Sequence, residues 1–147
     1  MVQGNNVKDA EGVAAVFAEL ATSASLMSAS KLLDLIAMLP GCGGEQSDAV
    51  QAYTQALLYH GAKQVVETWV RIPREQWPKS WHGKFRDPVV PLRLALYGHP
   101  LAGAFWERHC REALLSVGFT PLDGWECCYV HKTLKLILSG SISVIPF

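Results

Sequence analysis

The sequence predicts an α+β fold in which an antiparallel sheet is backed by helices. Two observations support this class. Helices and strands are expected in mixed order along the chain, with short connections of the kind that join hairpin strands. Half of the 147 residues are hydrophobic and five are tryptophan, a composition that can fill a core and differs from that of disordered chains.

The first expected element is a core-packing helix over residues 22–39. Thr22 or Ser23 can cap its start, and Pro40 followed by Gly41 ends it. Apolar side chains recur along this stretch at helical spacing, so one side of the helix is expected to face a core.

The middle of the chain is expected to contain short strands. Residues 46–50 predict a strand that passes into a helical turn after Asp48. Residues 65–72 and 89–96 are further strand candidates because they are rich in Val, Thr and Trp or in Val and Leu. Between them, the prolines and polar side chains of residues 73–88 predict a loop.

The clearest helix is expected over residues 100–117, with a proline at its first position, where the missing N–H costs nothing. Gly118 follows at the place of a left-handed C-cap. Residues 127–131 and 134–138 predict two strands joined by a tight hairpin turn at Lys132 and Thr133.

Charge and hydropathy bear on location and partners. The 13 basic and 13 acidic residues cancel, which argues mildly against a free-standing nucleic-acid binder. No apolar run approaches the roughly 18 residues of a membrane span, and the first residues lack the pattern of a secretory signal. The chain is therefore expected to be intracellular, in the cytoplasm or nucleus, with no membrane partner.

The four cysteines are expected to be reduced, buried thiols. Cys127 and Cys128 are adjacent, while Cys42 and Cys110 lie far from them in sequence, which makes a poor disulfide framework. A zinc site is disfavoured because adjacent ligands seldom both reach one tetrahedral metal.

Asp48 and Tyr53 are the first candidates for chemistry. Two-metal phosphoryl transfer needs carboxylates fixed at the end of a strand, where the backbone aims them at the ions. Tyr53 lies five residues further on and returns to the same side after one helical turn. On spacing alone the alternative is a surface aspartate after a glycine-rich loop and a tyrosine packed in the core.

A second segment follows about forty residues later. It runs Ala-Leu-Tyr-Gly, with Tyr97 and Gly98, into a helix that contains Trp106. In this order and spacing the segments around Asp48, Tyr53 and Trp106 resemble those of the reverse transcriptases of copia-type LTR retrotransposons. These enzymes form the RNA-directed DNA polymerase domain of the Pol polyprotein, so the resemblance implies a partial fingers and palm fold.

The resemblance implies a role for each matched residue. Asp48 would be the catalytic aspartate that ligates Mg²⁺, and the Ala49 carbonyl would add a ligand beside the nucleotide pocket. Tyr53 would be the gate that excludes a ribose 2′-OH and so selects deoxynucleoside triphosphates. Leu101 stands in the pocket where the family usually has a glutamine that touches the nucleotide or template, and leucine cannot make those hydrogen bonds.

The largest departure from the family lies near residue 139. Residues 134–139 resemble the strand that leads into the family's Tyr-Val-Asp-Asp hairpin, but residues 140–147 contain no carboxylate. We therefore expect residues 1–139 to form a partial reverse-transcriptase domain and residues 140–147 to be a tail outside the family. Mg²⁺ binds poorly to a single carboxylate, so the fragment is not expected to polymerise alone.

Basic residues gather between the two motifs, with aromatic residues interleaved among them. Such a pattern suits a nucleic-acid strand, although a solvated loop with inward-packed tryptophans is an equal alternative. The family implies an RNA template, a DNA primer and the remainder of the Pol polyprotein as partners. Two other functions stay open: a non-enzymatic retroelement relic and a small α+β nucleic-acid-binding module. The basic candidates are Arg71, Arg74, Lys79, Lys84 and Arg86.

Overall fold

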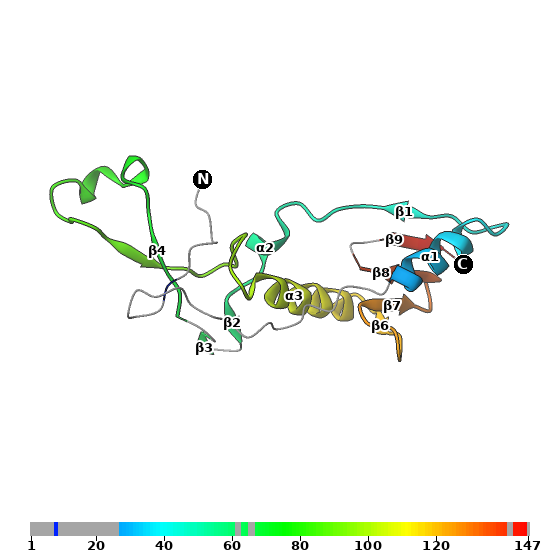
Figure 1. Ribbon diagram of the computed structural model, residues 1–147. Helices are drawn as coiled ribbons and strands as arrows, with labels where there is room; N and C mark the ends of the chain where they lie inside the picture. Colours follow the sequence, from blue (N-terminus) through cyan, green and yellow to red (C-terminus); the bar gives the residue numbers. More distant parts are fainter. Residues whose placement is uncertain (1–7, 9–26, 61–62, 65–66, 141–142, 147) are drawn as a thin grey trace. The chain divides into compact units, whose positions relative to one another are not determined.

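The structure is a computed structural model that describes residue 8 and residues 27–60, 63–64, 67–140 and 143–146 (Figure 1). Helices and antiparallel strands occur together in this part of the chain, which confirms the α+β prediction. No helix among the described residues has both the length and the apolar character to cross a membrane. The helices are α1 (Met27–Ala37), α2 (Ala52–Gln55) and α3 (Ala102–Ser116), with 3-10 turns η1 (Arg74–Gln76) and η2 (Lys79–Trp81).

The described strands pair in three antiparallel sheets. The largest has the order β1-β9-β8-β7-β6, and the other two are the pairs β2-β3 and β4-β5. The strands are β1 (Glu45–Gln46), β2 (Tyr59–His60), β3 (Lys63–Gln64), β4 (Trp69–Arg71), β5 (Val89–Pro91), β6 (Thr120–Pro121), β7 (Cys128–His131), β8 (Leu136–Ser139) and β9 (Ser143–Pro146).

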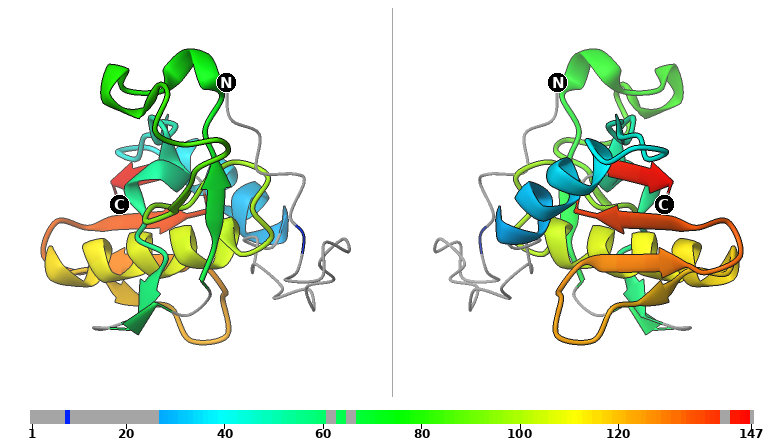
Figure 2. Two further views of the ribbon diagram at one scale, coloured as in Figure 1. Left: turned by 90° about the vertical axis from the view of Figure 1, so that its left-hand side faces the viewer. Right: turned by 90° about the vertical axis from the view of Figure 1, so that its right-hand side faces the viewer.

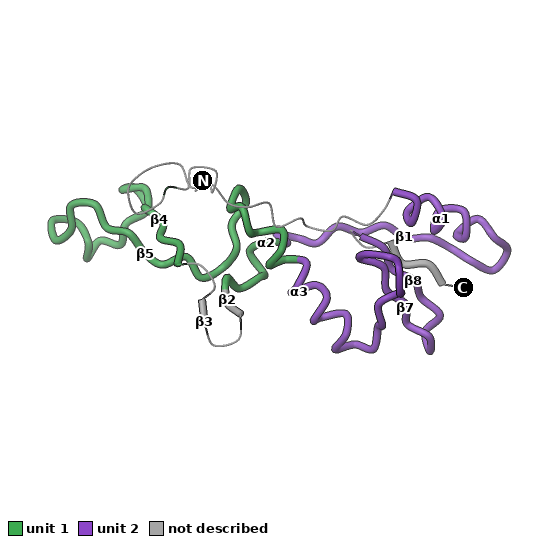
Figure 3. The backbone as a smooth tube through the Cα atoms, turned by 60° about the horizontal axis from the view of Figure 1, so that its bottom comes forward, with its two compact units in different colours: residues 1–20, 53–106 green, residues 21–52, 107–147 purple. Residues whose placement is uncertain are grey.

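The chain divides into two compact units, which are coloured separately in Figure 3. Unit 1 comprises Met1–Leu20 and Tyr53–Trp106, and unit 2 comprises Ala21–Ala52 and Glu107–Phe147. Each unit has its own cluster of buried hydrophobic side chains. The two units are therefore described one at a time.

Unit 2 is built around the five-stranded sheet. In this unit α1 contacts β8 and β9, and residues 107–116 of α3 lie on the other side of the sheet (Figure 2). Side chains alternate between the faces of a strand, so Tyr129 and its partner Leu138 share one face. Together with Phe119 they form the buried cluster of the unit, against which Leu114 of α3 packs.

The first element of unit 2 is the predicted amphipathic helix. In α1 the side chains of Ala29 and Leu33 are buried, four residues apart on one face, as the spacing predicted. The observed helix ends at Ala37, shortly before Pro40, and the expected caps at Thr22 and Ser23 lie outside the described residues.

Unit 1 contains residues 53–55 of α2, the start of α3 and the hairpin of β4 and β5. A short stretch after α2 runs antiparallel to the residues after β5, with a bridge between Leu57 and Leu94. The Leu58 N–H donates to the Arg93 carbonyl at 2.9 Å, and the Ala95 N–H donates to the Ala56 carbonyl at 2.8 Å. The buried cluster of this unit is Ala56, Leu58, Ala95, Leu101, Ala102 and Phe105.

The helix predicted over 100–117 is confirmed as α3, and Gly118 has the expected left-handed conformation with φ +96°. The tight turn predicted at Lys132 and Thr133 is wrong. Four residues, 132–135, connect β7 to β8. The longer loop closes because Lys135 adopts φ +54° and the Leu134 N–H donates to Nδ1 of His131 at 3.2 Å.

The remaining strands are shorter than predicted or were not predicted. The strand expected over 46–50 is β1, only two residues long, and the helical turn after Asp48 is α2. The strands expected over 65–72 and 89–96 are β4 and β5, three residues each. Residues 143–146, placed by the sequence in a tail, form β9 and pair with both β1 and β8. The pairing of β9 with β1 joins residues about a hundred positions apart, and such pairing has no local sequence signal.

Candidate functional site

The basic candidates lie on one hairpin of unit 1, residues 69–91, which we call the basic arm. Its base is the pairing of β4 with β5, in which Trp69 lies opposite Pro91 and Arg71 opposite Val89. Its tip contains η1 and η2, each of which begins directly after a proline with φ near −54°. Proline fixes this angle in advance, so the sequence of the tip favours two short helical turns where a plain loop was expected.

Aromatic rings hold the tip of the basic arm together. The Trp77 ring lies 6.5 Å from that of Trp81 and 5.9 Å from that of His82, and Trp81 lies 5.9 Å from Phe85. The Trp77 indole N–H also donates to the Ile72 carbonyl at 2.8 Å, which fixes its orientation. Trp77 and Trp81 are half-buried in this cluster, whereas the Phe85 side chain is 52% exposed. The rings thus serve packing and leave an aromatic surface in solvent.

The positive charges of the basic arm point to solvent. All five predicted basic residues are exposed. The guanidinium carbon of Arg74 lies 5.9 Å from the Trp77 ring centroid, within the range of a cation–π contact. Arg71 pairs with Asp87 at 2.9 Å. A hollow of about 360 Å³ opens among these groups, lined by Arg71, Ile72, Pro73, Arg74, Trp77, Arg86 and Asp87.

His99 fixes the foot of the basic arm to the start of α3. Its Nδ1 accepts the Leu101 N–H at 3.2 Å, so Nε2 carries the proton and donates to Oγ1 of Thr68 at 3.1 Å. Burial lowers the pKa of this imidazole, which favours the neutral form that both bonds need. Sequence reasoning missed this residue, although a histidine just before a helix-starting proline can cap the helix.

Asp48 and Ala49 belong to unit 2. Asp48 is exposed and follows the end of β1 by two residues. Ala49 is half-buried beside it. β1 is an edge strand, and β9 lies between it and β8 in the sheet.

Tyr53 and Leu101 belong to unit 1, and both lie at its buried cluster. The Tyr53 ring packs against that cluster and lies 4.6 Å from the ring of Tyr97. Leu101 is a member of the cluster and only 6% exposed. The structure therefore gives Leu101 a packing position in the core. Within unit 1 it brings these two candidates of the nucleotide pocket to one cluster.

The end of β8 is closed by a buried hydroxyl group and a glycine turn. Ser139 lies here and is buried, and the Cys128 thiol donates to its hydroxyl at 3.5 Å. The chain then turns at Gly140, which has φ +58° and donates its N–H to the Cys127 carbonyl at 3.1 Å. Ser139 and Cys128 supply a hydroxyl and a thiol at this end of the strand, and neither supplies the negative charge of a carboxylate.

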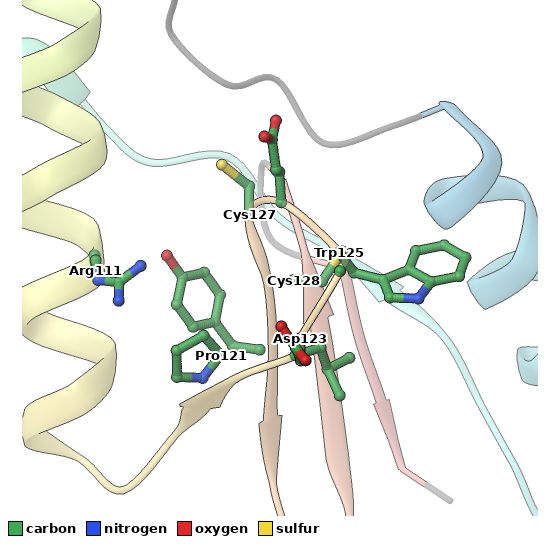
Figure 4. A pocket seen from close by; sticks show the side chains of 10 residues that line it. Arg111, Pro121, Asp123, Trp125, Cys127 and Cys128 are labelled. Atoms are coloured by element: carbon green, nitrogen blue, oxygen red, sulfur yellow. The ribbon is translucent and has the colours of Figure 1, made fainter.

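A pocket in unit 2 was not predicted from the sequence. It has a volume of about 500 Å³ and lies between α3 and the loop that follows β6 (Figure 4). The Arg111 side chain extends from α3 toward Pro121 and the β7 residues of the pocket (Figure 4). Glu126, Cys127, Cys128 and Tyr129 are also among the lining residues.

Cys127 has two unusual properties in this pocket. Its backbone adopts φ +53°, which is uncommon for a residue other than glycine or asparagine. Burial, followed by the negative charge of Glu107, raises the pKa of its thiol to about 11. Such a thiol is protonated at neutral pH and is a weak nucleophile.

The cysteines form no disulfide, and all four lie in the described part of the chain. The prediction of buried thiols is confirmed for Cys128, while the other three are half-buried. Within the residues that the structure describes, no group of three or more His, Cys, Asp or Glu side chains is arranged to hold a metal ion.

Comparison with known proteins adds no relative to these observations. No protein-family model, no curated protein and no solved structure matches the chain.

Proposed function

We propose that this chain is a partial reverse-transcriptase domain that binds a nucleic-acid strand through its basic arm. The observation that carries the proposal is the arm itself, where five exposed basic side chains lie on the same hairpin as a cluster of aromatic rings. Cationic side chains neutralise phosphates, and aromatic faces stack on bases without regard to sequence. The neutral charge of the whole chain does not oppose this function because the hairpin itself carries five basic residues against two acidic ones, Glu75 and Asp87.

The two polymerase-like segments support the reverse-transcriptase part of the proposal. Asp48 is exposed just after β1, where a carboxylate can reach solvent and a metal ion. Tyr53 lies on α2 against the ring of Tyr97, which is part of the second segment. A steric gate requires a ring that is held in place, and this contact holds it.

The same proposal makes the chain catalytically incomplete by itself. Mg²⁺ prefers six oxygen ligands in nearly octahedral geometry, and two-metal transfer needs several carboxylates. Residues 134–147 contain none, so Asp48 is the one matched carboxylate of the family's set in this sequence. The missing carboxylates would come from a further part of the Pol polyprotein. A chain that acts with an RNA template and a DNA primer would function in the cytoplasm or nucleus.

The first experiment measures binding of an RNA–DNA hybrid by fluorescence anisotropy between about 50 and 200 mM salt. Replacing Lys79 and Lys84 of the basic arm by glutamate should weaken binding and reduce the salt slope by about two, because each lost phosphate contact contributes about 0.9. A matched control replaces Lys31 and Lys132, two exposed lysines of unit 2, by glutamate. Equal losses in both double variants would show that only net charge matters and would refute a role for the arm.

The second experiment is primer extension with Mg²⁺ and deoxynucleoside triphosphates. The 147-residue chain should incorporate no nucleotide, and titration with Mg²⁺ should reveal no saturable site near millimolar concentration. Mg²⁺-dependent incorporation that is lost in Asp48→Asn would overturn the incomplete-site part of the proposal. The alternative of a non-enzymatic relic or a small binding module also predicts that no nucleotide is incorporated. It differs by predicting that Tyr53→Ala leaves nucleotide binding unchanged.

A further inference from the structure

The hollow on the basic arm has an unbalanced charge. Its lining contains three guanidinium groups, on Arg71, Arg74 and Arg86, and one carboxylate, on Asp87. The carboxylate is already paired with Arg71 at 2.9 Å. Two positive charges are therefore in surplus around a space of about 360 Å³, and an anion of charge near −2 would balance them.

The wall of the hollow adds a second requirement. Trp77 forms part of it, and the hydrogen bond from its indole N–H to the Ile72 carbonyl holds the ring in one orientation. Ile72 and Pro73 extend this apolar wall. A ligand that fills the hollow thus carries an anion for the guanidinium groups and a flat or apolar part for the wall.

We infer that the hollow binds the terminal phosphate monoester of a single-stranded nucleic acid, with the terminal nucleoside against Trp77. A monoester carries a charge of about −1.5 to −2 at neutral pH, whereas a diester inside a strand carries −1. Arginine forks match phosphate oxygens in bidentate geometry. This inference rests on the proposed function, because it names the part of the strand that the basic arm recognises.

The surroundings of the hollow favour a nucleic acid over a phosphorylated peptide. The exposed side chains of Lys79, Lys84 and Phe85 lie on the same arm outside the hollow. They provide further cations for the next phosphates and an aromatic face for a neighbouring base. A phosphopeptide has no repeating charge that would use them.

Asp87 is a natural competitor for the phosphate. The side chains of Arg71 and Asp87 are 72% and 52% exposed, so their pair is well solvated and weakly held. An incoming phosphate can take the place of the carboxylate on Arg71. Removing the carboxylate should therefore favour the ligand, which is the opposite of the effect expected if the pair only supports the fold.

The test uses the full chain and labelled oligothymidylates of about ten nucleotides with a 5′ phosphate, a 3′ phosphate or neither. A terminal phosphate on at least one end should tighten binding about tenfold, and Arg86→Gln should abolish this preference because it weakens the phosphorylated strand about tenfold more than the unphosphorylated strand. Asp87→Asn should tighten the phosphorylated strand about threefold. Asp34→Asn and Lys31→Gln, on exposed positions of α1, are the charge-matched controls and should leave the preference unchanged.

The outcomes separate this inference from the proposed function. If the chain binds none of the strands, the proposed function fails and the inference fails with it. If it binds all of them with equal affinity, only the inference is overturned. If a phosphoserine peptide displaces the phosphorylated strand as well as a nucleoside monophosphate does, the nucleoside makes no contact at Trp77 and the nucleic-acid assignment is refuted. Circular dichroism of each variant confirms that the fold is retained.

Discussion

Replacement of Gly118 by alanine tests how the end of α3 is fixed in unit 2. Gly118 has φ +96°, and a Cβ at this position would lie 2.9 Å from Nε2 of His131. His131 is held by two hydrogen bonds. Its Nε2 donates to the Val117 carbonyl at 3.1 Å, and its Nδ1 accepts the Leu134 N–H at 3.2 Å. The added methyl group therefore strains the backbone and displaces an anchored ring.

The free energy of unfolding should fall by about 2–4 kcal/mol, as a sum of two effects. The left-handed backbone costs an alanine about 1–2 kcal/mol. Loss of the two hydrogen bonds of His131 costs about 0.5–1.5 kcal/mol each, toward the lower end because both are exposed to solvent. The edge-to-face contact of His131 with Phe119, at 5.2 Å, would be disturbed as well.

Gly124→Ala is the matched control. Gly124 also has a left-handed backbone, with φ +75°, but a Cβ there meets no atom within 4 Å. Its substitution should cost only the backbone term of about 1–2 kcal/mol. Urea unfolding followed by circular dichroism measures both variants.

A His131→Ala background completes the experiment. With the imidazole removed, Gly118→Ala should cost no more than Gly124→Ala, because the clash is gone. Equal destabilisation by the two glycine variants in the wild-type background would refute the proposed clash with His131.

Three further predictions concern side chains that are buried or half-buried. Burial lowers the pKa of His99 from 6.5, so the unfolded chain takes up a proton at a higher pH than the folded chain does, and the free energy of unfolding should decline as the pH falls below about 6.5. His99→Gln should reduce the change in the urea midpoint between pH 5 and 7. An unchanged pH dependence of the midpoint in this variant would contradict the prediction. The pKa of Cys127 is raised from 9.0 to about 11, which lowers the thiolate fraction at neutral pH about 100-fold. Iodoacetamide should therefore label this thiol far faster in urea than in the folded chain. Equal labelling rates, measured by mass spectrometry, would count against the raised pKa. Leu58 is 1% exposed, so Leu58→Ala should cost about 2–5 kcal/mol, whereas Leu57→Ala, at a 55% exposed side chain, should cost much less by the same measurement.

Local features could be predicted where the sequence contains the whole signal. The signals for α3 all lie within residues 100–118: a proline near its start, apolar side chains at helical spacing and a glycine after its end. The structure confirms the helix and its end at Gly118. The exposed charges of the basic arm were predictable for the same reason, since consecutive residues supply both the cations and the rings. The two 3-10 turns of its tip were missed, although a proline precedes each one.

The hairpin turn between β7 and β8 shows where local reasoning fails. The loop after His131 is longer than two residues because its side chain bonds the Leu134 N–H, a contact that no turn propensity contains. Residues 143–146 pair along their whole length with the neighbouring β8, and they also pair with β1, about a hundred residues earlier in the chain. Strand pairing depends on which edges meet, and the distance along the chain does not reveal that.

Some features of the candidate site could be predicted from the sequence, and others required the tertiary structure. The sequence by itself determined the α+β class, the helix α3 and the run of basic and aromatic residues on the basic arm, because each follows from neighbouring residues. Only the tertiary structure decided that Leu101 lies in a core, that Ser139 is buried beside Cys128, and that three arginines and Trp77 line one hollow. Those facts depend on contacts between distant residues, which form only when the chain packs.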